Sequence, residues 1–427
     1  MNGRQFNGDA PRFQPENRTP LPPAGLYIHV PFCIKKCPYC NFYSVEDVSR
    51  IRDFVEALHK EIRLSSPQPH TFDTLYIGGG TPSLLTGQQI QGLIECAQET
   101  FDFAEAVETT IEVNPGTVST EFIDGILKAG VNRVNVGVQS FDDDNLRVLE
   151  RIHSAQEACQ TLETLRHRGV TNLGMDLIYG LPGQSAQDWH LDLDRALDFG
   201  PEHLSCYMLS YEPNTPFSRR CQKGRLTPLD PDTVGHLFEE TIQLLTDRGY
   251  HHYEISNFSR GKRFRSKHNQ KYWFHQPYVG LGPSAHSFID PRRWWNHSTL
   301  DTYLASLEIN RLPTGGWEDL DVGQLMLETI FLGLRTSAGI DTAVFENRYN
   351  LNFETYFGDL LDRLRSQDLL DRRQGRMALT RKGLLVCDTV AALFADKLDG
   401  VGKSPISALR CIPCPVKFSL RETAKPI

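Results

Sequence analysis

Residues 26–40 read Leu-Tyr-Ile-His-Val-Pro-Phe-Cys-Ile-Lys-Lys-Cys-Pro-Tyr-Cys, an apolar run followed by Cys33, Cys37 and Cys40. The run has the length of a buried strand, so the cysteines are expected on the loop after it. A disulfide fits poorly because the number of thiols is odd and their span is short. Structural zinc needs four ligands, and no fourth Cys or His lies at the usual spacing. Three thiolates suffice for three irons of a [4Fe–4S] cluster, with the fourth iron open; another metal and a structural accident remain the alternatives.

The composition of the whole chain bounds the class of protein. Its 427 residues carry 45 Lys and Arg against 53 Asp and Glu, a net charge of −8, and 40% of the residues are hydrophobic. This balance suits two or three globular units and excludes both wholesale disorder and general polyanion binding. No apolar run approaches a membrane span, and residues 1–25 lack the hydrophobic core of a signal peptide. A cytoplasmic location with reduced thiols is therefore expected. Seven further cysteines are dispersed and need no shared role: Cys96, Cys159, Cys206, Cys221, Cys387, Cys411 and Cys414.

Outward from the cysteine loop, strand-like runs alternate with segments of helical apolar spacing. Six such units in succession predict a parallel sheet with helices outside it, either an open doubly wound sheet or a barrel. The expected strands are Leu26–Phe32, Thr74–Ile77, Thr109–Val113, Arg133–Val138, Leu173–Tyr179 and Leu204–Leu209.

Polar residues follow or end most of these strands. The second strand runs into Gly78-Gly-Gly-Thr-Pro82, the third carries Glu112, the fourth ends at Gln139 and the fifth holds Asp176. Each residue alone is more often structural, as a cap or a tight turn. In a barrel, however, the carboxyl ends of the strands converge on one site, so their recurrence favours a shared functional site.

These motifs resemble the radical SAM superfamily and, within it, the oxygen-independent coproporphyrinogen oxidase group. The resemblance covers most of residues 25–400 and implies an α/β fold, a partial (β/α)6 barrel with a smaller C-terminal winged-helix-like α+β domain. It rests on Tyr27-Ile-His-Val-Pro-Phe-Cys33, Gly78-Gly-Gly-Thr-Pro-Ser83, Glu112-Val-Asn-Pro115, Gly137-Val-Gln-Ser-Phe141 and Asp176-Leu-Ile-Tyr-Gly-Leu-Pro-Gly183.

The resemblance also implies the cofactors and the residues that hold them. Cys33, Cys37 and Cys40 would bind the [4Fe–4S] cluster, whose open iron takes S-adenosyl-L-methionine (SAM) in this superfamily. An electron donor would be needed if SAM is cleaved. The residues implied for SAM are Tyr27, Tyr39, Gly79, Gly80, Thr81, Glu112, Gln139, Arg151, Asp176 and Ser210.

One departure points to a subgroup. The oxidases have a fourth cysteine two residues after the third, where this chain has Phe42. By contrast, His268-Asn-Gln-Lys-Tyr-Trp273 is similar to the HNxxYW motif of the HemW group, whose members are regarded as heme chaperones. The resemblance thus implies a protein that binds heme and passes it to an unnamed acceptor protein. The alternative is a radical SAM oxidase-like enzyme that acts on an anionic tetrapyrrole, although loss of the fourth cysteine disfavours oxidase activity.

Heme is expected near this motif. Residues 255–289 contain no Asp or Glu but six Lys and Arg residues, together with many aromatic rings. Cations beside aromatic side chains suit a flat macrocycle edged by carboxylates, and His268 offers an axial nitrogen. A solvated basic loop over an ordinary aromatic core is the alternative. The residues expected to contact heme are His268, Asn269, Tyr272 and Trp273.

Five segments are expected along the chain: a flexible segment 1–24, the barrel 25–250, the basic and aromatic segment 251–316, a winged-helix-like domain 317–400 and a tail 401–427. Residues 317–400 hold ten basic and fourteen acidic side chains. Their net charge of −4 opposes nucleic-acid binding and favours a lid or docking domain at the barrel mouth. No transmembrane segment is expected, while a homodimer and peripheral membrane contact both stay open at this point.

Overall fold

A computed structural model describes residues 21–65 and 68–398. The predicted segment 1–24 is therefore described only from residue 21 onward, and the predicted tail with Cys411 and Cys414 lies outside the described residues.

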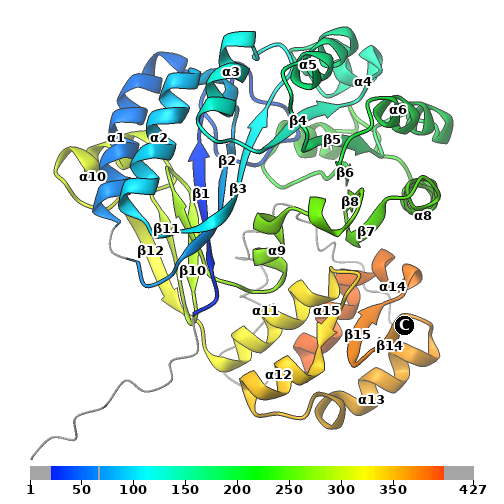
Figure 1. The fold of residues 1–427 in the computed structure, drawn as a ribbon. Helices are drawn as coiled ribbons and strands as arrows, with labels where there is room; N and C mark the ends of the chain where they lie inside the picture. Colours follow the sequence, from blue (N-terminus) through cyan, green and yellow to red (C-terminus); the bar gives the residue numbers. More distant parts are fainter. Residues whose placement is uncertain (1–20, 66–67, 399–427) are drawn as a thin grey trace, which may run out of the picture.

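The centre of the molecule is a sheet whose six parallel strands follow one another in chain order (Figure 1). Most of their residues are buried, because helices cover one face and the interior of the barrel lies against the other. The predicted partial (β/α)6 architecture is confirmed. The strands are β1 (Ala24–Val30), β2 (Phe72–Gly79), β3 (Phe103–Val113), β4 (Arg133–Gln139), β5 (Leu173–Tyr179) and β6 (His203–Met208).

All six expected strands are present, and the largest difference is at β3. This strand starts six residues before the predicted Thr109. The sequence did not indicate the earlier start, because the first half of the strand is partly exposed. Residues 103–107 read Phe-Ala-Glu-Ala-Val, and the exposed Glu105 interrupts the apolar run on which the prediction depended.

Helices follow the strands and place their apolar faces on the sheet. In α1, for example, Phe54, Leu58 and Ile62 are fully buried at helical spacing. Reciprocal capping boxes begin α2, α5 and α6, which fixes where these helices leave their loops. The helices of this half are α1 (Ile51–Leu64), α2 (Gly87–Thr100), α3 (Thr120–Lys128), α4 (Asp143–Val148), α5 (Ala155–His167), α6 (Ala186–Asp198), α7 (Pro216–Gln222) and α8 (Pro231–Asp247).

Residues 251–319 extend this sheet at both ends. A hairpin of β7 (His251–Glu254) and β8 (Asn257–Ser259) pairs antiparallel with β6. At the other end, β9 (Tyr278–Leu281) pairs parallel with β1 and is followed by β10 (His286–Ile289), β11 (Arg292–Asn296) and β12 (Thr314–Asp319). Between the two ends lies α9 (Lys267–Trp273), and α10 (Leu300–Glu308) packs on α1 (Figure 1). The strand β12 crosses the boundary predicted at residue 316 because it pairs along its length with β11.

The C-terminal region has the predicted winged-helix-like composition of helices and a small antiparallel sheet, in the order β13-β15-β14. The helix expected over residues 382–394 is divided at Val386 into α14 and α15. The elements are α11 (Val322–Leu334), β13 (Ile340–Asp341), α12 (Thr342–Tyr349), α13 (Phe353–Ser366), β14 (Leu370–Arg373), β15 (Arg376–Leu379), α14 (Arg381–Leu385) and α15 (Cys387–Leu398).

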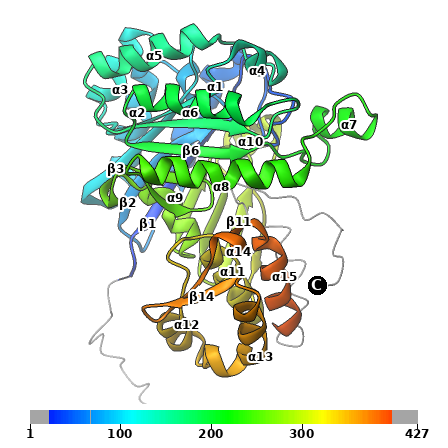
Figure 2. The same cartoon turned by 90° about the vertical axis from the view of Figure 1, so that its right-hand side faces the viewer.

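This C-terminal region packs against α9, the β7–β8 hairpin and the added strands (Figures 1 and 2). Backbone bonds join Ile255 N to Arg335 O at 2.9 Å and Ser337 N to Tyr253 O at 3.1 Å. None of residues 320–398 lines the cavity beside the cysteine loop, so the expected role as a lid or docking domain stays a prediction. None of the helices among the described residues is both long and apolar enough to cross a bilayer.

Candidate functional site: the cysteine loop and its cavity

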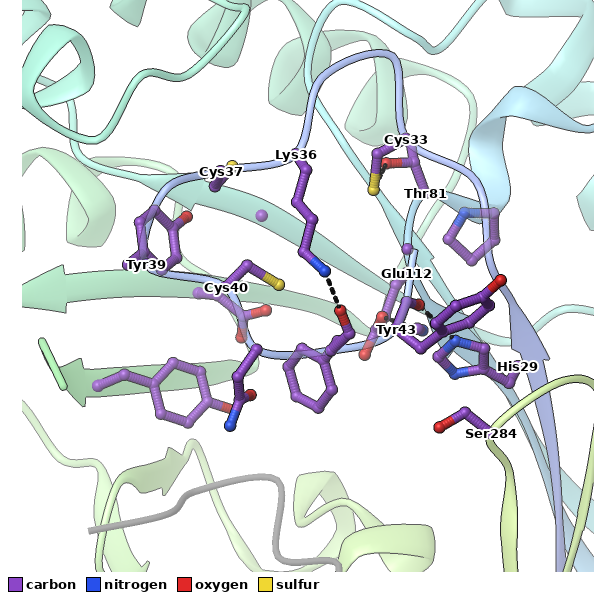
Figure 3. Close-up of a pocket in the computed structure, with 18 of the residues that line it drawn as sticks. His29, Cys33, Lys36, Cys37, Tyr39, Cys40, Tyr43, Thr81, Glu112 and Ser284 are labelled. Carbon is purple, nitrogen blue, oxygen red and sulfur yellow. Dashed lines mark hydrogen bonds between the residues drawn. The ribbon is translucent and has the colours of Figure 1, made fainter. Parts of the chain in front are cut away.

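The cysteine loop is fixed by backbone contacts to distant parts of the chain. Cys33 N donates to Val45 O at 3.0 Å, and Phe217 N donates to Pro38 O at 3.0 Å. These bonds hold the start and the middle of the loop, so the three thiols have defined places around one cavity (Figure 3).

A chain of polar contacts connects two of the thiols. Arg151 Nη1 donates to Cys37 Sγ at 3.4 Å, and Arg151 Nη2 donates to Asn114 Oδ1 at 2.7 Å. Asn114 Nδ2 donates to Thr81 Oγ1 at 2.8 Å, and the Thr81 hydroxyl donates to Cys33 Sγ at 3.7 Å. Donors directed at sulfur stabilise negative charge on it, so this network suits thiolate ligands of an iron centre.

The chemistry of the loop fits a cluster better than a single ion. Within the described residues, no three His, Cys, Asp or Glu side chains converge closely enough to hold one metal ion. A [4Fe–4S] cluster takes each thiolate on a different iron, so its ligands stand further apart. Burial raises the pKa of the Cys33 thiol and raises that of Cys40 to about 11. Ligation to iron would release these protons, because metal binding stabilises the thiolate.

The glycine-rich turn after β2 lies directly against the loop. Gly79 has a φ of +108°, and a Cβ at this position would lie 2.5 Å from His29 Nδ1. A Cβ at Gly80 would lie 2.5 Å from Phe32 O, while Thr81 N donates to the same oxygen at 2.7 Å. The turn therefore admits no side chains at its two glycines, which leaves backbone exposed to a ligand.

Glu112 is held in a fixed orientation on β3. Its Oε1 accepts from the Tyr76 hydroxyl at 2.6 Å, and its Oε2 accepts from Gly79 N at 3.1 Å. Burial raises the pKa of this carboxyl to about 7. Sequence reasoning missed Tyr76 because it lies within an apolar strand, where an aromatic ring is normally part of the core.

Two polar atoms in the cavity wall have unused bonding capacity. Asp176 Oδ1 and Arg151 Nε are buried without a hydrogen-bond partner among the described residues. The other oxygen of Asp176 accepts from Asn135 Nδ2 at 2.7 Å. Buried polar atoms are normally paired, so such orphans mark where a ligand supplies the missing bonds.

One cavity of about 690 Å³ brings most of the predicted residues together (Figure 3). Trp273 is the exception: it is buried against Phe331 and Leu332, where α9 meets α11. The predicted residues that line the cavity are Tyr27, Cys33, Cys37, Tyr39, Cys40, Gly79, Gly80, Thr81, Glu112, Gln139, Arg151, Asp176, Ser210, His268, Asn269 and Tyr272.

His268 is built into the barrel floor rather than presented to a ligand. Its Nδ1 lies 2.8 Å from Thr74 Oγ1, and its Nε2 lies 2.9 Å from the Tyr272 hydroxyl. The ring stacks on Tyr76 at 5.1 Å and is 1% exposed, and burial lowers its pKa to about 3. Since both ring nitrogens have partners, the structure does not present His268 as an axial ligand.

The basic segment also differs from its expected role. None of its six cations lines the cavity: Lys271 pairs with Asp73 at 2.6 Å, and Arg263 lies over Phe264. Arg260, Lys262, Arg263 and Lys267 are exposed, which agrees with the alternative of a solvated basic loop over an aromatic core.

Sequence reasoning also missed the face that β10, β11 and β12 turn to the cavity. Its lining residues are His286, Arg293, Trp295 and Glu318. Only the pairing of these strands beyond β9 brings them to the cavity, and no local motif signals that pairing.

Six parallel βα units, a three-cysteine loop and polar strand ends define a radical SAM protein. The radical SAM superfamily profile matches residues 27–196, and the HemN C-terminal domain profile matches residues 320–386. The heme chaperone HemW of Synechocystis sp. is 37% identical over 335 residues, which cover 76% of this chain and 81% of that protein. HemW of Lactococcus lactis is 33% identical over 87% of this chain and 97% of its own. The solved coproporphyrinogen III oxidase (HemN) of Escherichia coli is 26% identical with a TM-score of 0.76, covering 88% of this chain and 91% of that one.

The chain therefore belongs to the HemW family of radical SAM proteins. The predicted family and fold are confirmed, and the [4Fe–4S] cluster and SAM come with radical SAM membership.

Proposed function

We propose that this protein is a heme chaperone, which binds heme, holds a [4Fe–4S] cluster and SAM in its barrel, and transfers heme to an acceptor protein. The observation that carries the proposal is the three-cysteine loop on the same cavity as a full set of SAM-type polar residues, with Phe42 in place of a fourth cysteine. The relatives named heme chaperone HemW, which match over most of the chain, support it.

Each group of cavity residues has a proposed role. The thiols of Cys33, Cys37 and Cys40 bind the cluster, and Arg151 and Thr81 stabilise sulfur charge through the bonds described above. A bound cluster would offer its open iron to the amino and carboxylate groups of SAM and, when reduced, would supply the electron needed to cleave the sulfonium. The remaining SAM contacts are proposed as backbone at Gly79 and Gly80, Glu112 toward the ribose, Tyr39 toward the adenine, and Tyr27, Gln139, Asp176 and Ser210 as the polar wall.

An oxidase-like radical SAM enzyme acting on an anionic tetrapyrrole is the second candidate. The similarity of the whole fold to E. coli coproporphyrinogen III oxidase favours it. Phe42 opposes it, because the oxidases have a cysteine at this position of the loop.

The proposal extends to partners and location. An acceptor protein must receive the heme, and an electron donor is required if SAM is cleaved. We propose a cytoplasmic location, peripheral contact with a membrane where the acceptor lies there, and a homodimer as the working assembly. The segment boundaries at 24, 250 and 400 likewise stay proposals, whereas β12 runs across the boundary expected at residue 316.

The deciding experiment uses the full-length protein with a reconstituted cluster under anaerobic conditions. Hemin is titrated and then offered to an apo-protein, and a parallel sample receives SAM, reductant and coproporphyrinogen III. Tight hemin binding with transfer, and no vinyl product, is expected. Vinyl product would establish the enzyme and refute the chaperone proposal.

A further inference from the structure

We infer that the inner face of β10–β12 is a stacking surface for a planar ring system, and that heme lies against it. We call the row formed by His286, Trp295 and Gly316 the aromatic wall. This inference rests on the proposed function and deepens it, since neither the cysteine loop nor the HNxxYW motif predicts a ligand here.

Strand register builds the aromatic wall. His286 on β10 lies directly across from Trp295 on β11, which lies directly across from Gly316 on β12. The two rings are tilted by 32° with centroids 5.9 Å apart, and both line the cavity. Side chains that lie directly across from each other on neighbouring strands point to the same face of the sheet. The two rings therefore form one surface.

Gly316 gives the indole its position. A Cβ at Gly316 would lie 2.6 Å from Cζ2 of Trp295 and 2.9 Å from its Cε2. The indole thus lies over bare backbone, which places it close to the sheet and leaves room on its other side. Any larger residue at position 316 would push the ring toward the cavity.

The wall adjoins the SAM end of the same cavity. The turn that leads into β10 packs on β1, since a Cβ at Gly282 would lie 2.4 Å from His29 O. Ser284 in this turn lines the cavity near His29 and Tyr43 (Figure 3). A ligand on the aromatic wall would therefore share the cavity with SAM without displacing the loop cysteines.

The chemistry of the wall favours the face of a macrocycle. The two charged residues that these strands present to the cavity, Arg293 and Glu318, are paired with each other at 2.7 Å, so this end of the cavity presents rings and little free charge. Three adjacent strands span about 10 Å. A ring of four pyrroles can cover both His286 and Trp295, whereas a single purine can cover only one of them.

The test is anaerobic hemin titration of the full-length protein, followed by absorbance. Stacking predicts that Trp295→Ala weakens hemin binding about ten-fold, while Trp295→Phe recovers most of the affinity. His286→Leu puts a side chain of similar size without a ring at this position, and about a three-fold loss is expected. Trp317→Ala is the matched control: this tryptophan is the next residue after Gly316, is 59% exposed and does not line the cavity. Its hemin affinity should equal that of the wild type.

Further measurements distinguish a failure of the aromatic wall from a failure of the proposed function. Reconstituted cluster absorbance and SAM affinity should be unchanged in Trp295→Ala, which shows that the SAM end is intact. Hemin binding by the wild type with equal affinity in Trp295→Ala and His286→Leu would refute the wall and leave the proposed function standing. Loss of SAM affinity with unchanged hemin affinity would assign the wall to a nucleoside and overturn the inference. No hemin binding by the wild type would refute the proposed function itself.

Discussion

The cysteine loop at the top of the cavity and helix α9 at its floor are both surrounded by polar side chains, but the two regions differ in how their polar atoms are paired. Facing the cysteine loop, Asp176 Oδ1 and Arg151 Nε are buried without partners among the described residues, and burial raises the pKa of the Cys33 and Cys40 thiols. At the floor, both ring nitrogens of His268 already have partners. The first arrangement is incomplete without a ligand, and the second is complete without one.

This difference distinguishes residues that are available to bind a ligand from residues that only match a sequence motif. A polar residue that lines a cavity is a strong ligand candidate only where its bonding capacity is unused, because breaking an existing buried hydrogen bond costs free energy. This criterion supports the proposal that the loop holds a cofactor, whereas His268 on α9 belongs to the packed interior below it.

Loss of one thiol should have the largest effect. Cys37→Ser removes the thiol that Arg151 contacts and leaves two cysteines for the cluster, so the visible absorbance of the reconstituted protein should fall close to zero. Iron content checks the result. Cys159→Ser, which lies outside the cavity, should reconstitute normally. Iron at the wild-type level in Cys37→Ser would exclude three-cysteine ligation.

His268→Ala should lower the free energy of unfolding by about 2–4 kcal/mol, because it removes a fully buried ring and leaves the Thr74 and Tyr272 hydroxyls without their partner. Denaturant unfolding measures this effect. Hemin affinity should stay within about two-fold of the wild type once the protein is folded. A variant of normal stability that no longer binds hemin would instead make His268 a ligand.

These first two variants also show what the sequence could and could not supply. The six strands and the residues at their carboxyl ends were predicted correctly because each depends on a local pattern, an apolar run followed by a polar residue. The roles of His268 and Trp273 depend on where α9 packs. That position follows from long-range contacts, such as the bond between His268 and Thr74 on β2, which no local pattern reports.

The same limit applies to the aromatic wall. Trp295 and His286 belong to short strands whose pairing depends on β9 joining β1, between residues some 250 positions apart in the chain. Composition identified an aromatic region but could not say which rings face a cavity and which fill the core.

Acidification should lower the free energy of unfolding through His268, and this effect should be smaller than that of removing the His268 ring. His268 has a folded pKa of about 3 against an ordinary value of 6.5, so the unfolded chain binds the extra proton between these values. Its contribution to stability is therefore complete above pH 6.5 and is lost as the pH falls toward 3. Between pH 7 and pH 5 the wild type should lose about 2 kcal/mol more than His268→Gln, whose side chain does not titrate. Parallel unfolding curves for the two proteins at both pH values would contradict a buried neutral histidine.

The smallest effect on hemin affinity should come from the cations of the basic segment, although the composition of the sequence drew attention to them. Lys262, Arg263 and Lys267 are exposed cations of the basic segment and do not line the cavity. Exposed charges outside the cavity act on a ligand only through solvent, where salt screens them. The triple alanine variant should therefore change hemin affinity by less than about two-fold at physiological ionic strength, measured by the same titration as Trp295→Ala. A ten-fold loss of hemin affinity that disappears in high salt would place the heme site at the basic segment. It would also show that net charge, rather than unused bonding capacity and ring stacking, selects the ligand.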